Sequence, residues 1–379
     1  MKHALTRNRQ IMSTVPIFLI LITAHVFAQT TGSKADKPTP TTSTPLKVFL
    51  GGDVMVGRYV NGKLRLHGGE HPFQVIGDLA PKEHLTMINL ETPFSDEMAP
   101  MIKRSKNPAA LKVVFRLPTS YASQLVDAGV DVAVLANNHS EDCGQKNIRT
   151  TVNTLATAGI KSAGAHHDGD PFAPVLMEHN GHPAAVLAGT ILRNYGGARS
   201  RDDETLAFYS WKTVKRDLSE AVKMARATHP ERAIIVSLHW GKEFALDVGD
   251  WSRNIARGLI DAGATVVWGH HSHTFQPIEV YGDGLILYGT GNLVFDMIGL
   301  TSRRSGLVET DLVRSKNGRY RVEGFTMHGV TLFGARAPAR PSKPNEIKAT
   351  MKRLEKSFTS NAQPKTVVRK GRTLSWRRQ

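Results

Sequence analysis

The folded part of the sequence begins with the stretch Lys47-Val48-Phe49-Leu50-Gly51-Gly52-Asp53, in which an apolar run ends in two glycines and a carboxylate. A short apolar run bounded by glycine is typical of a buried β-strand. Four further runs of this kind predict strands at residues 86–90, 131–135, 233–238 and 264–268. The first strand therefore belongs to a series of buried strands along the chain.

Helical patterns separate these strands and complete the predicted fold. The predicted helices cover residues 118–128, 145–158, 213–227 and 251–262, with Gly159 and Gly263 as stop signals after the second and the fourth. Buried strands that alternate with helices predict an α/β layered fold. Towards the end, residues 285–288, 306–313 and 320–325 are expected to form antiparallel strands.

The N-terminal segment has the order of an export signal. Basic residues up to Arg9 precede an apolar run at 15–22, and small residues follow up to Ala28. We expect residues 1–28 to be a signal peptide, with an uncleaved anchor as the alternative, and the protein to be exported to the periplasm or cell surface. Residues 29–46, rich in Thr, Pro, Ser and Lys, are predicted to be a flexible linker before a domain at 47–335.

Composition and charge narrow the class of protein. The 379 residues are 40% hydrophobic, which is enough for a sizeable core, and the single cysteine, Cys143, excludes a disulfide framework. The formal charge is +16, of which residues 351–379 carry +8, nine Lys and Arg minus Glu355. We expect residues 336–379 to be an extended or weakly helical basic extension that touches an anionic polymer or membrane surface. The absence of nucleic-acid motifs and an aromatic content of only 7% argue against a nucleic-acid partner.

Polar side chains that bind metals or move protons follow five predicted strands. They are Asp53, Glu91, Asn138 with His139, His239, and His271 with His273. In layered α/β folds, sites lie beyond the carboxyl ends of the strands. An extended segment at 271–273 would aim both imidazoles the same way. Together these residues predict a centre for one or two divalent ions such as Mn²⁺, Zn²⁺ or Fe²⁺.

The same residues carry a resemblance to a known family. The blocks that carry it are Gly52-Asp53-Val54-Met55-Val56-Gly57-Arg58, Asn89-Leu90-Glu91-Thr92, Ala136-Asn137-Asn138-His139-Ser140-Glu141-Asp142, His239-Trp240-Gly241-Lys242-Glu243, Gly269-His270-His271-Ser272-His273, and residues 288–296. In this order they resemble the CapA family of capsule or poly-γ-glutamate synthesis proteins, which is similar to calcineurin-like metallophosphatases. The resemblance covers roughly residues 46–300.

The resemblance implies a four-layer α/β/β/α sandwich of the metallophosphatase type with a metal centre at its rim. The metal ligands it implies are Asp53, Glu91, Asn138, His239, His271 and His273. It implies a catalytic or anion-binding role for His139, which Asp142 would orient. Arg58, Lys242 and Glu243, which lie in the same blocks, are candidate substrate contacts. The chain departs from the metallophosphatase pattern at Met55, where a histidine is usual, and at Glu91, where an aspartate is usual.

Two functions remain open from the sequence. The first is metal-dependent hydrolysis of a phosphate-containing substrate or of a γ-glutamyl polymer. This hydrolysis would belong to capsule synthesis, or the protein would be a periplasmic phosphoesterase unrelated to capsule. The second is non-catalytic binding of an anionic polymer within an envelope biosynthesis complex, with Arg58 and Lys242 as candidate contacts for carboxylates. Fold alone does not decide between them.

Overall fold

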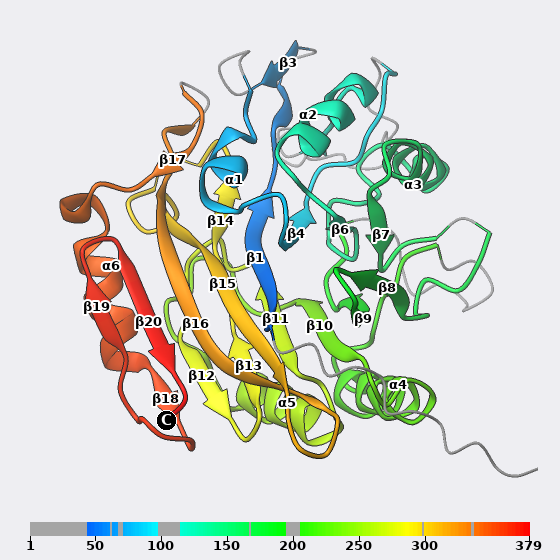
Figure 1. Cartoon of the computed structure of the whole chain (residues 1–379). Coiled ribbons are helices and arrows are strands. Elements are labelled where there is room, and N and C mark those ends of the chain that lie inside the picture. Colours follow the sequence, from blue (N-terminus) through cyan, green and yellow to red (C-terminus); the bar gives the residue numbers. More distant parts are fainter. Residues whose placement is uncertain are drawn as a thin grey trace, which may run out of the picture. The chain divides into compact units, whose positions relative to one another are not determined.

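The stretch that opens the folded sequence forms β1 (Leu46–Val54), drawn in dark blue at the centre of Figure 1. The computed structural model describes residues 44–60, 63–66, 71–97, 114–166, 168–194, 205–297, 299–334 and 337–379. The predicted signal peptide and most of the predicted linker lie outside these residues. The linker was expected to reach residue 46, but Leu46 already belongs to β1 and its side chain is buried.

β1 is an inner strand of a ten-stranded sheet with the order β19-β20-β16-β15-β1-β4-β6-β7. On one side it pairs in parallel with β4 (Leu85–Leu90), which is followed by β6 (Val132–Val134) and β7 (Lys161–Ala163). On the other side follow the antiparallel strands β15 (Arg304–Arg314), β16 (Tyr320–Thr331), β20 (Thr373–Arg377) and β19 (Val368–Lys370). Two short strands, β14 (Asn292–Val294) and β17 (Arg340–Pro341), pair with β1 and β16.

A seven-stranded sheet faces the first one, with the order β18-β12-β13-β11-β10-β9-β8. Its inner strands are β9 (His182–Thr190), β10 (Ala233–His239), β11 (Val266–His270) and β13 (Gly284–Leu287), which run parallel. Its outer strands are β8 (Val175–His179), β12 (Ile278–Tyr281) and β18 (Thr359–Ser360). The parallel core of this sheet includes three strands that the sequence predicts, β10, β11 and β13. The last of these was expected to be antiparallel, but it pairs in parallel with β11 and is antiparallel only to β12.

Alternation along β1 explains why four layers form. Val48 and Leu50 belong to the core cluster shared with the seven-stranded sheet, whereas Phe49 belongs to a second cluster with helices on the opposite face. Successive side chains of a strand point to opposite faces, so both faces of this sheet are covered. The predicted four-layer α/β/β/α sandwich is confirmed by this arrangement.

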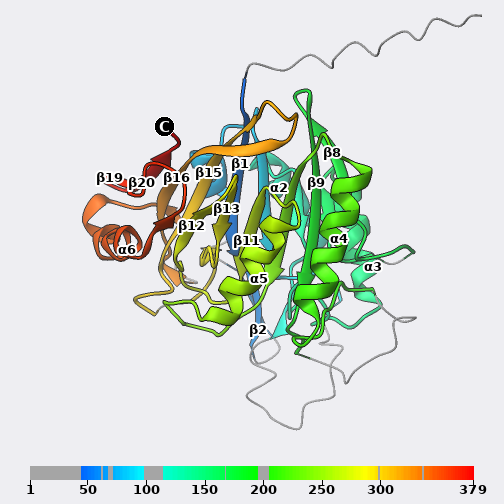
Figure 2. The same ribbon diagram turned by 90° about the horizontal axis from the view of Figure 1, so that it is seen from below.

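Helices form the two outer layers. The helices α1 (Gln74–Leu79), α2 (Ala122–Asp127) and α3 (Asn147–Thr157) contribute to the second cluster, and a 3₁₀ turn, Thr119–Tyr121, precedes α2. The helices α4 (Val214–Thr228) and α5 (Asp250–Asp261) lie side by side along the seven-stranded sheet, as Figure 2 shows. The four helices predicted from the sequence are confirmed within a few residues at each end.

A three-stranded sheet lies beyond the carboxyl end of β1, with the order β3-β2-β5. Its strands are β2 (Gly57–Val60), β3 (Lys63–Leu66) and β5 (Val114–Phe115), and Arg58 pairs with Phe115 across it. None of these short strands was expected from the sequence. Among the described residues, no helix is both long enough and apolar enough to cross a membrane.

The expectation of an extended or weakly helical basic extension is wrong. Residues 344–357 form α6 (Pro344–Ser357), and β20 adds to the edge of β16. Ile347, Met351 and Leu354 are buried on one face of α6, and Trp376 of β20 is only 3% exposed. A few well-spaced apolar residues therefore suffice to bind this segment to the core, even though most of its residues are polar.

Several arginines of this segment make contacts within the fold. Arg377 lies 2.6 Å from Asp311, and Arg369 lies 3.0 Å from Glu355. Arg353 donates hydrogen bonds to the backbone oxygens of Leu246 and Phe275. A free basic arm was the premise for the predicted membrane or polymer contact, and this premise does not hold.

Candidate metal centre

The carboxyl ends of β1, β4, β6, β10 and β11 meet where the two large sheets approach each other. Asp53 on β1 is flanked by Asn89 on β4 and by Asn292 on β14. On the other sheet, His239 on β10 lies beside His270 on β11. The structure thus brings together side chains that are far apart in sequence, as the strand pattern predicted.

Two glycines allow this close approach. A Cβ atom on Gly52 would lie 2.1 Å from the Gly291 backbone oxygen, and one on Gly269 would lie 2.0 Å from the Tyr288 oxygen. Real side chains do not tolerate such distances, so only glycine fits at either position. Each glycine directly precedes a polar residue of the cluster, and its small size sets how closely the neighbouring strand ends can pack.

Asp53 is fully buried and is surrounded by hydrogen-bond donors. Asn89 Nδ2 donates to its Oδ1 at 2.8 Å, and the Nδ1 atoms of His270 and His273 lie 3.2 and 3.3 Å from its two oxygens. Burial by itself raises the pKa of Asp53, but the hydrogen bonds and charges of His270 and His273 outweigh it and lower the pKa well below its usual range. Asp53 is therefore an ionised carboxylate at the centre of the cluster.

Glu91, one residue beyond β4, lacks the partners that a buried carboxylate needs. It is fully buried, and neither of its oxygens has a hydrogen-bond partner among the described residues. Burial and the charges of Asp53, Asp142 and Glu243 raise the pKa of Glu91 well above its usual range. Buried charges are normally paired or coordinate a metal, so Glu91 marks a place where a cation would restore the balance.

Two imidazoles and an amide form a further part of the cluster. His239 Nε2 is 3.9 Å from Glu91 Oε1 and 2.9 Å from Asn138 Oδ1, and the ring centroids of His239 and His271 are 4.9 Å apart. Burial and the neighbouring His271 lower the pKa of His239 well below its usual range, and burial with His273 lowers that of His271 to about 3. Both rings are therefore neutral at pH 7, which is the form that binds metals.

The segment with His271 and His273 is not extended, contrary to expectation. β11 ends at His270, and both residues then adopt left-handed backbone conformations, with φ of 83° and 54°. Such φ values are uncommon outside glycine and are often found at functional sites. The tight turn still brings the two rings within 6.0 Å of each other.

His139 stands beside Glu91 with its own supporting contacts. Its Nδ1 lies 2.8 Å from Asp142 Oδ2, and its Nε2 lies 3.9 Å from Glu91 Oε1. The Phe115 ring stacks on the imidazole at 3.9 Å, and the Phe115 backbone N–H donates to Asp142 at 2.6 Å. Burial raises the pKa of Asp142, while the charge of His139 opposes that rise. The Asp142 contact fixes which nitrogen of His139 faces the cluster.

The remaining predicted residues lie around this cluster. Met55 is fully buried in the second hydrophobic cluster, so it takes no place in the polar cluster. Arg58 forms an ion pair with Asp296 at 2.9 Å, whereas Lys242 and Glu243 are exposed. Of these, Glu243 lies close enough for its charge to raise the pKa of Glu91.

Sequence reasoning did not assign to the site five residues that the structure places here: Asn89, His270, Asn292, Asn194 and Phe115. Asn292 Oδ1 lies 2.9 Å from His273 Nδ1, and Asn194 contacts both Asn138 and the ring of His139. His270 and Asn292 stand within blocks that carry the family resemblance, so their position after a strand could have identified them. Asn194 and Phe115 follow no recognisable pattern.

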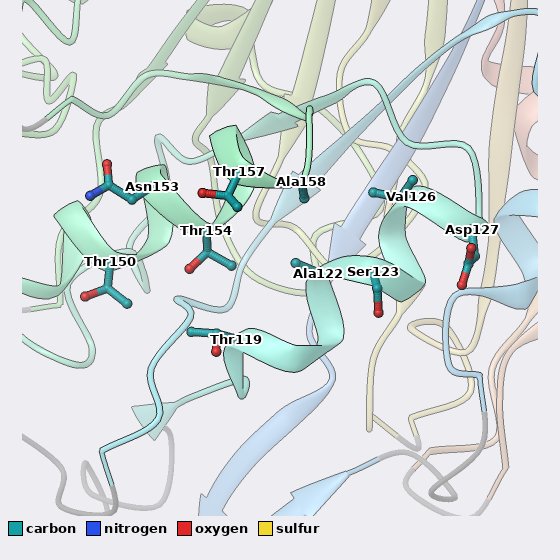
Figure 3. A pocket seen from close by; sticks show the side chains of 10 residues that line it. All are labelled: Thr119, Ala122, Ser123, Val126, Asp127, Thr150, Asn153, Thr154, Thr157 and Ala158. Atoms are coloured by element: carbon teal, nitrogen blue, oxygen red, sulfur yellow. The ribbon is translucent and has the colours of Figure 1, made fainter.

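Two cavities differ in their relation to this cluster. A groove of about 710 Å³ lies between α2 and α3, and Figure 3 shows its lining of small and hydroxyl-bearing side chains such as Ser123, Thr150 and Thr154. No residue of the polar cluster lines it. A smaller cavity of about 410 Å³ is lined by Arg58, Asp296 and Phe244, whose ring centroid lies 6.0 Å from that of His273.

The donor set suits a divalent metal ion. Ligand atoms of Asp53, Glu91 and His273 all lie within 4.8 Å of one another, and all three residues are buried. Carboxylates combined with neutral imidazoles suit borderline ions such as Zn²⁺, Mn²⁺ and Fe²⁺. The unpartnered oxygens of Glu91 offer ligand atoms to such an ion, which would displace the proton that the raised pKa of Glu91 favours.

Comparisons of the sequence with known proteins place the chain in a family. The family described as "Bacterial capsule synthesis protein PGA_cap" matches residues 47–297. The PGA biosynthesis protein CapA of Bacillus subtilis is 29% identical over 330 residues, which cover 86% of this chain and 82% of that protein. A probable polyglutamine synthesis accessory protein of Mycobacterium tuberculosis is 30% identical over 299 residues, covering 68% and 76%.

Two solved structures that match parts of the chain share little sequence with it. A hypothetical protein from Thermus thermophilus has a TM-score of 0.38 and 16% identity, with 78% of this chain and 98% of that one covered. The sulfate thiohydrolase SoxB of the same organism has a TM-score of 0.39 and 16% identity, with 76% and 46% covered.

Proposed function

Since the chain belongs to the bacterial capsule synthesis family PGA_cap, we propose that it is an exported accessory protein of poly-γ-glutamate or related anionic polymer synthesis that carries a metal-dependent hydrolytic site. Relatives described as a PGA biosynthesis protein and as an accessory protein of polyglutamine synthesis support the biological context. The buried, unpartnered carboxylate of Glu91 beside an ionised Asp53 and neutral imidazoles supports the chemistry.

The residues that would hold the metal are grouped around Glu91. Asp53, Glu91 and His273 bring their ligand atoms together, and His239 and His271 lie close by with Asn138 beside His239, so these six residues would hold one or two ions. When bound, the metal supplies a Lewis acid and lowers the pKa of a bound water. Hydrogen bonds from Asn89 to Asp53, between His239 and Asn138, and between His273 and Asn292 hold these side chains in place without a substrate.

His139 is our candidate for the proton donor. Nδ1 of His139 donates a hydrogen bond to Asp142, and Nε2 of the same ring is therefore directed towards Glu91. A protonated His139 would give this proton to the leaving group of a phosphoester or of a γ-glutamyl amide. General acid catalysis of this kind typically contributes about 10²–10⁴-fold to the rate.

Metal analysis and a substrate panel test this proposal. We expect the purified protein to hold at least one divalent ion after reconstitution with Mn²⁺ or Zn²⁺, and His239→Ala and His271→Ala to lose metal. His229→Ala, at the end of α4, is the matched control and should keep the wild-type content. Wild-type protein that takes up no metal would contradict the proposal.

The substrate panel contains phosphodiesters, phosphomonoesters and γ-glutamyl oligomers. Cleavage of γ-glutamyl chains would support the proposal fully. Cleavage of phosphate esters alone would identify a phosphoesterase unrelated to capsule. Metal and polymer binding without cleavage of any substrate would favour the non-catalytic alternative. Cell fractionation of the full-length protein tests the proposed export, which a purely cytoplasmic location would contradict.

A further inference from the structure

The smaller cavity contains both a positive and a negative side chain, whereas a site for anions alone would need only the positive one. About 410 Å³ in volume, it is lined by Arg58, Phe244, Asp296, Met297, Thr301 and Ser302. Its charged side chains are one guanidinium and one carboxylate, so its lining is neutral overall. A volume of this size is within the usual range of small-molecule sites.

Arg58 is fixed in place from two directions. Its terminal nitrogen lies 2.9 Å from Asp296 Oδ1, and its guanidinium lies over the Phe115 ring at 5.3 Å. The side chains of Arg58 and Asp296 are only 23% and 14% exposed. The Nε atom of Arg58 is buried and has no hydrogen-bond partner among the described residues, so the guanidinium has bonding capacity that the fold leaves unused.

The cavity is joined directly to the candidate metal centre. The Phe244 backbone N–H donates to the oxygen of Ser272, between the two histidines of the turn, and Phe244 holds a left-handed φ of 62°. On the other wall, Asn292 Nδ2 donates to the Ser302 oxygen at 3.3 Å while its Oδ1 contacts His273. A group held in the cavity would therefore lie next to the cluster.

A ligand with only a negative charge would suit this cavity poorly. It would compete with Asp296 for Arg58 and leave a largely buried carboxylate with a weakened partner, which costs free energy. A ligand with an ammonium and a carboxylate on one carbon gives Asp296 and Arg58 a new partner each. We propose that the cavity recognises such an α-amino-acid group.

This inference rests on the proposed function, and it specifies which part of the polymer is bound. In a γ-linked glutamyl chain, the α-amino groups of interior residues are used in amide bonds. The amino-terminal residue alone carries a free ammonium beside its α-carboxylate. The cavity would thus select the amino-terminal end of the chain and hold that end beside the metal centre.

Calorimetry with two γ-glutamyl pentamers tests the inference on the full-length protein. One pentamer has a free amino terminus and the other is N-acetylated. We expect the wild type to bind the free form at least about tenfold more tightly, equivalent to about 1.4 kcal/mol. Asp296→Asn should remove this preference, and Arg58→Gln should weaken the binding of both pentamers.

Asp168→Asn is the matched control, because it removes an exposed ion pair with Arg149 and should keep the wild-type preference. Thermal unfolding of each variant shows whether it folds. If a variant does not fold, the affinities of the wild type for the two pentamers still decide the question. Equal affinity of the wild type for both pentamers overturns the inference and leaves the proposed function standing. Binding of neither pentamer overturns both the inference and the polymer assignment.

Discussion

His139 is held on three sides, by the Asp142 carboxylate, the Phe115 ring and the Asn194 amide. We expect His139→Ala to lower kcat by about 10²-fold or more, because the proton donor is lost. Asp142→Asn should cause a smaller loss, since the ring remains but is less firmly oriented. Rates are measured on whichever substrate the panel identifies, together with metal content.

The metal content of the His139→Ala protein should equal that of the wild type, because His139 is not among the proposed ligands. A variant that keeps the full rate would remove His139 from the mechanism. A variant that loses its metal would show instead that this imidazole is a ligand.

Glu309 provides a pH-dependent contribution to stability away from the metal centre. His328 lies 3.2 Å from one of its oxygens and Lys47 lies 2.5 Å from the other. The hydrogen bond from His328, opposed by burial and aided by Lys47, lowers the pKa of Glu309 to about 2. Because this pKa lies below the unfolded value of about 4.3, the contribution is complete at pH 7 and is lost as the pH falls from about 4.3 to 2.

We therefore expect Glu309→Gln to lower the free energy of unfolding at pH 7 by about 1–2 kcal/mol, allowing for partial exposure to solvent. The difference from wild type should shrink at pH 3. Urea unfolding at the two pH values measures it, with the exposed Glu178→Gln on β8 as control. A difference that stays constant between pH 7 and pH 3 would show that the charge of Glu309 is not its source.

The positions of most site residues could be predicted from the sequence, but their partners could not. Asp53, Glu91 and His239 each follow an apolar run, and a strand end is recognisable from such a run alone. Asn194 follows no such run, and its contact with His139 depends on how two distant loops fold together. The left-handed turn at His271 and His273 was also missed, because glycine rather than histidine is the usual signal for it.

At the scale of single elements, α6 shows how few apolar residues can bind a helix to the core. Met351 is fully buried on the face that it shares with Ile347 and Leu354. We expect Met351→Ala to lower the free energy of unfolding by about 2–5 kcal/mol, the usual cost of truncating a large core side chain. Chemical denaturation measures the change.

Lys352→Ala is the matched control for this helix, since Lys352 is the exposed neighbour of Met351. It should change stability by no more than about 0.5 kcal/mol. Similar values for the two variants would mean that α6 contributes little to the core.

Long apolar runs in the sequence made strands such as β10 and β11 predictable, whereas the apolar patterns of other elements were too short or too mixed to identify them. β8 has only three apolar residues, which are followed by Glu178 and His179, and of the five residues only Met177 is buried. The three-stranded sheet is built from strands of two to four residues, too short for a periodic pattern. α6 does carry a helical spacing of apolar residues, but the many charges around it favoured the interpretation as a tail.

At the scale of the whole molecule, the C-terminal segment completes the larger sheet. We expect removal of residues 359–379 to lower the unfolding temperature strongly or to yield insoluble protein. The deletion leaves the edge of β16 unpaired and removes Trp376, which stacks on Phe325. Thermal unfolding and size-exclusion chromatography of the truncated protein measure the effect. An unchanged unfolding temperature would show that the sheet does not depend on this segment.

The pairing of β1 with β15 has a consequence for how the chain is made. Lys47 reaches Asp311, 264 positions later in the chain, across this pairing. While the chain emerges from the ribosome or, if it is exported, from the export channel, one edge of β1 therefore stays unpaired until most of the protein is available to fold. Folding dominated by such distant contacts is slow, and an open strand edge invites aggregation meanwhile. Survival of the nascent chain should thus depend on chaperones that shield β1 until its partner arrives.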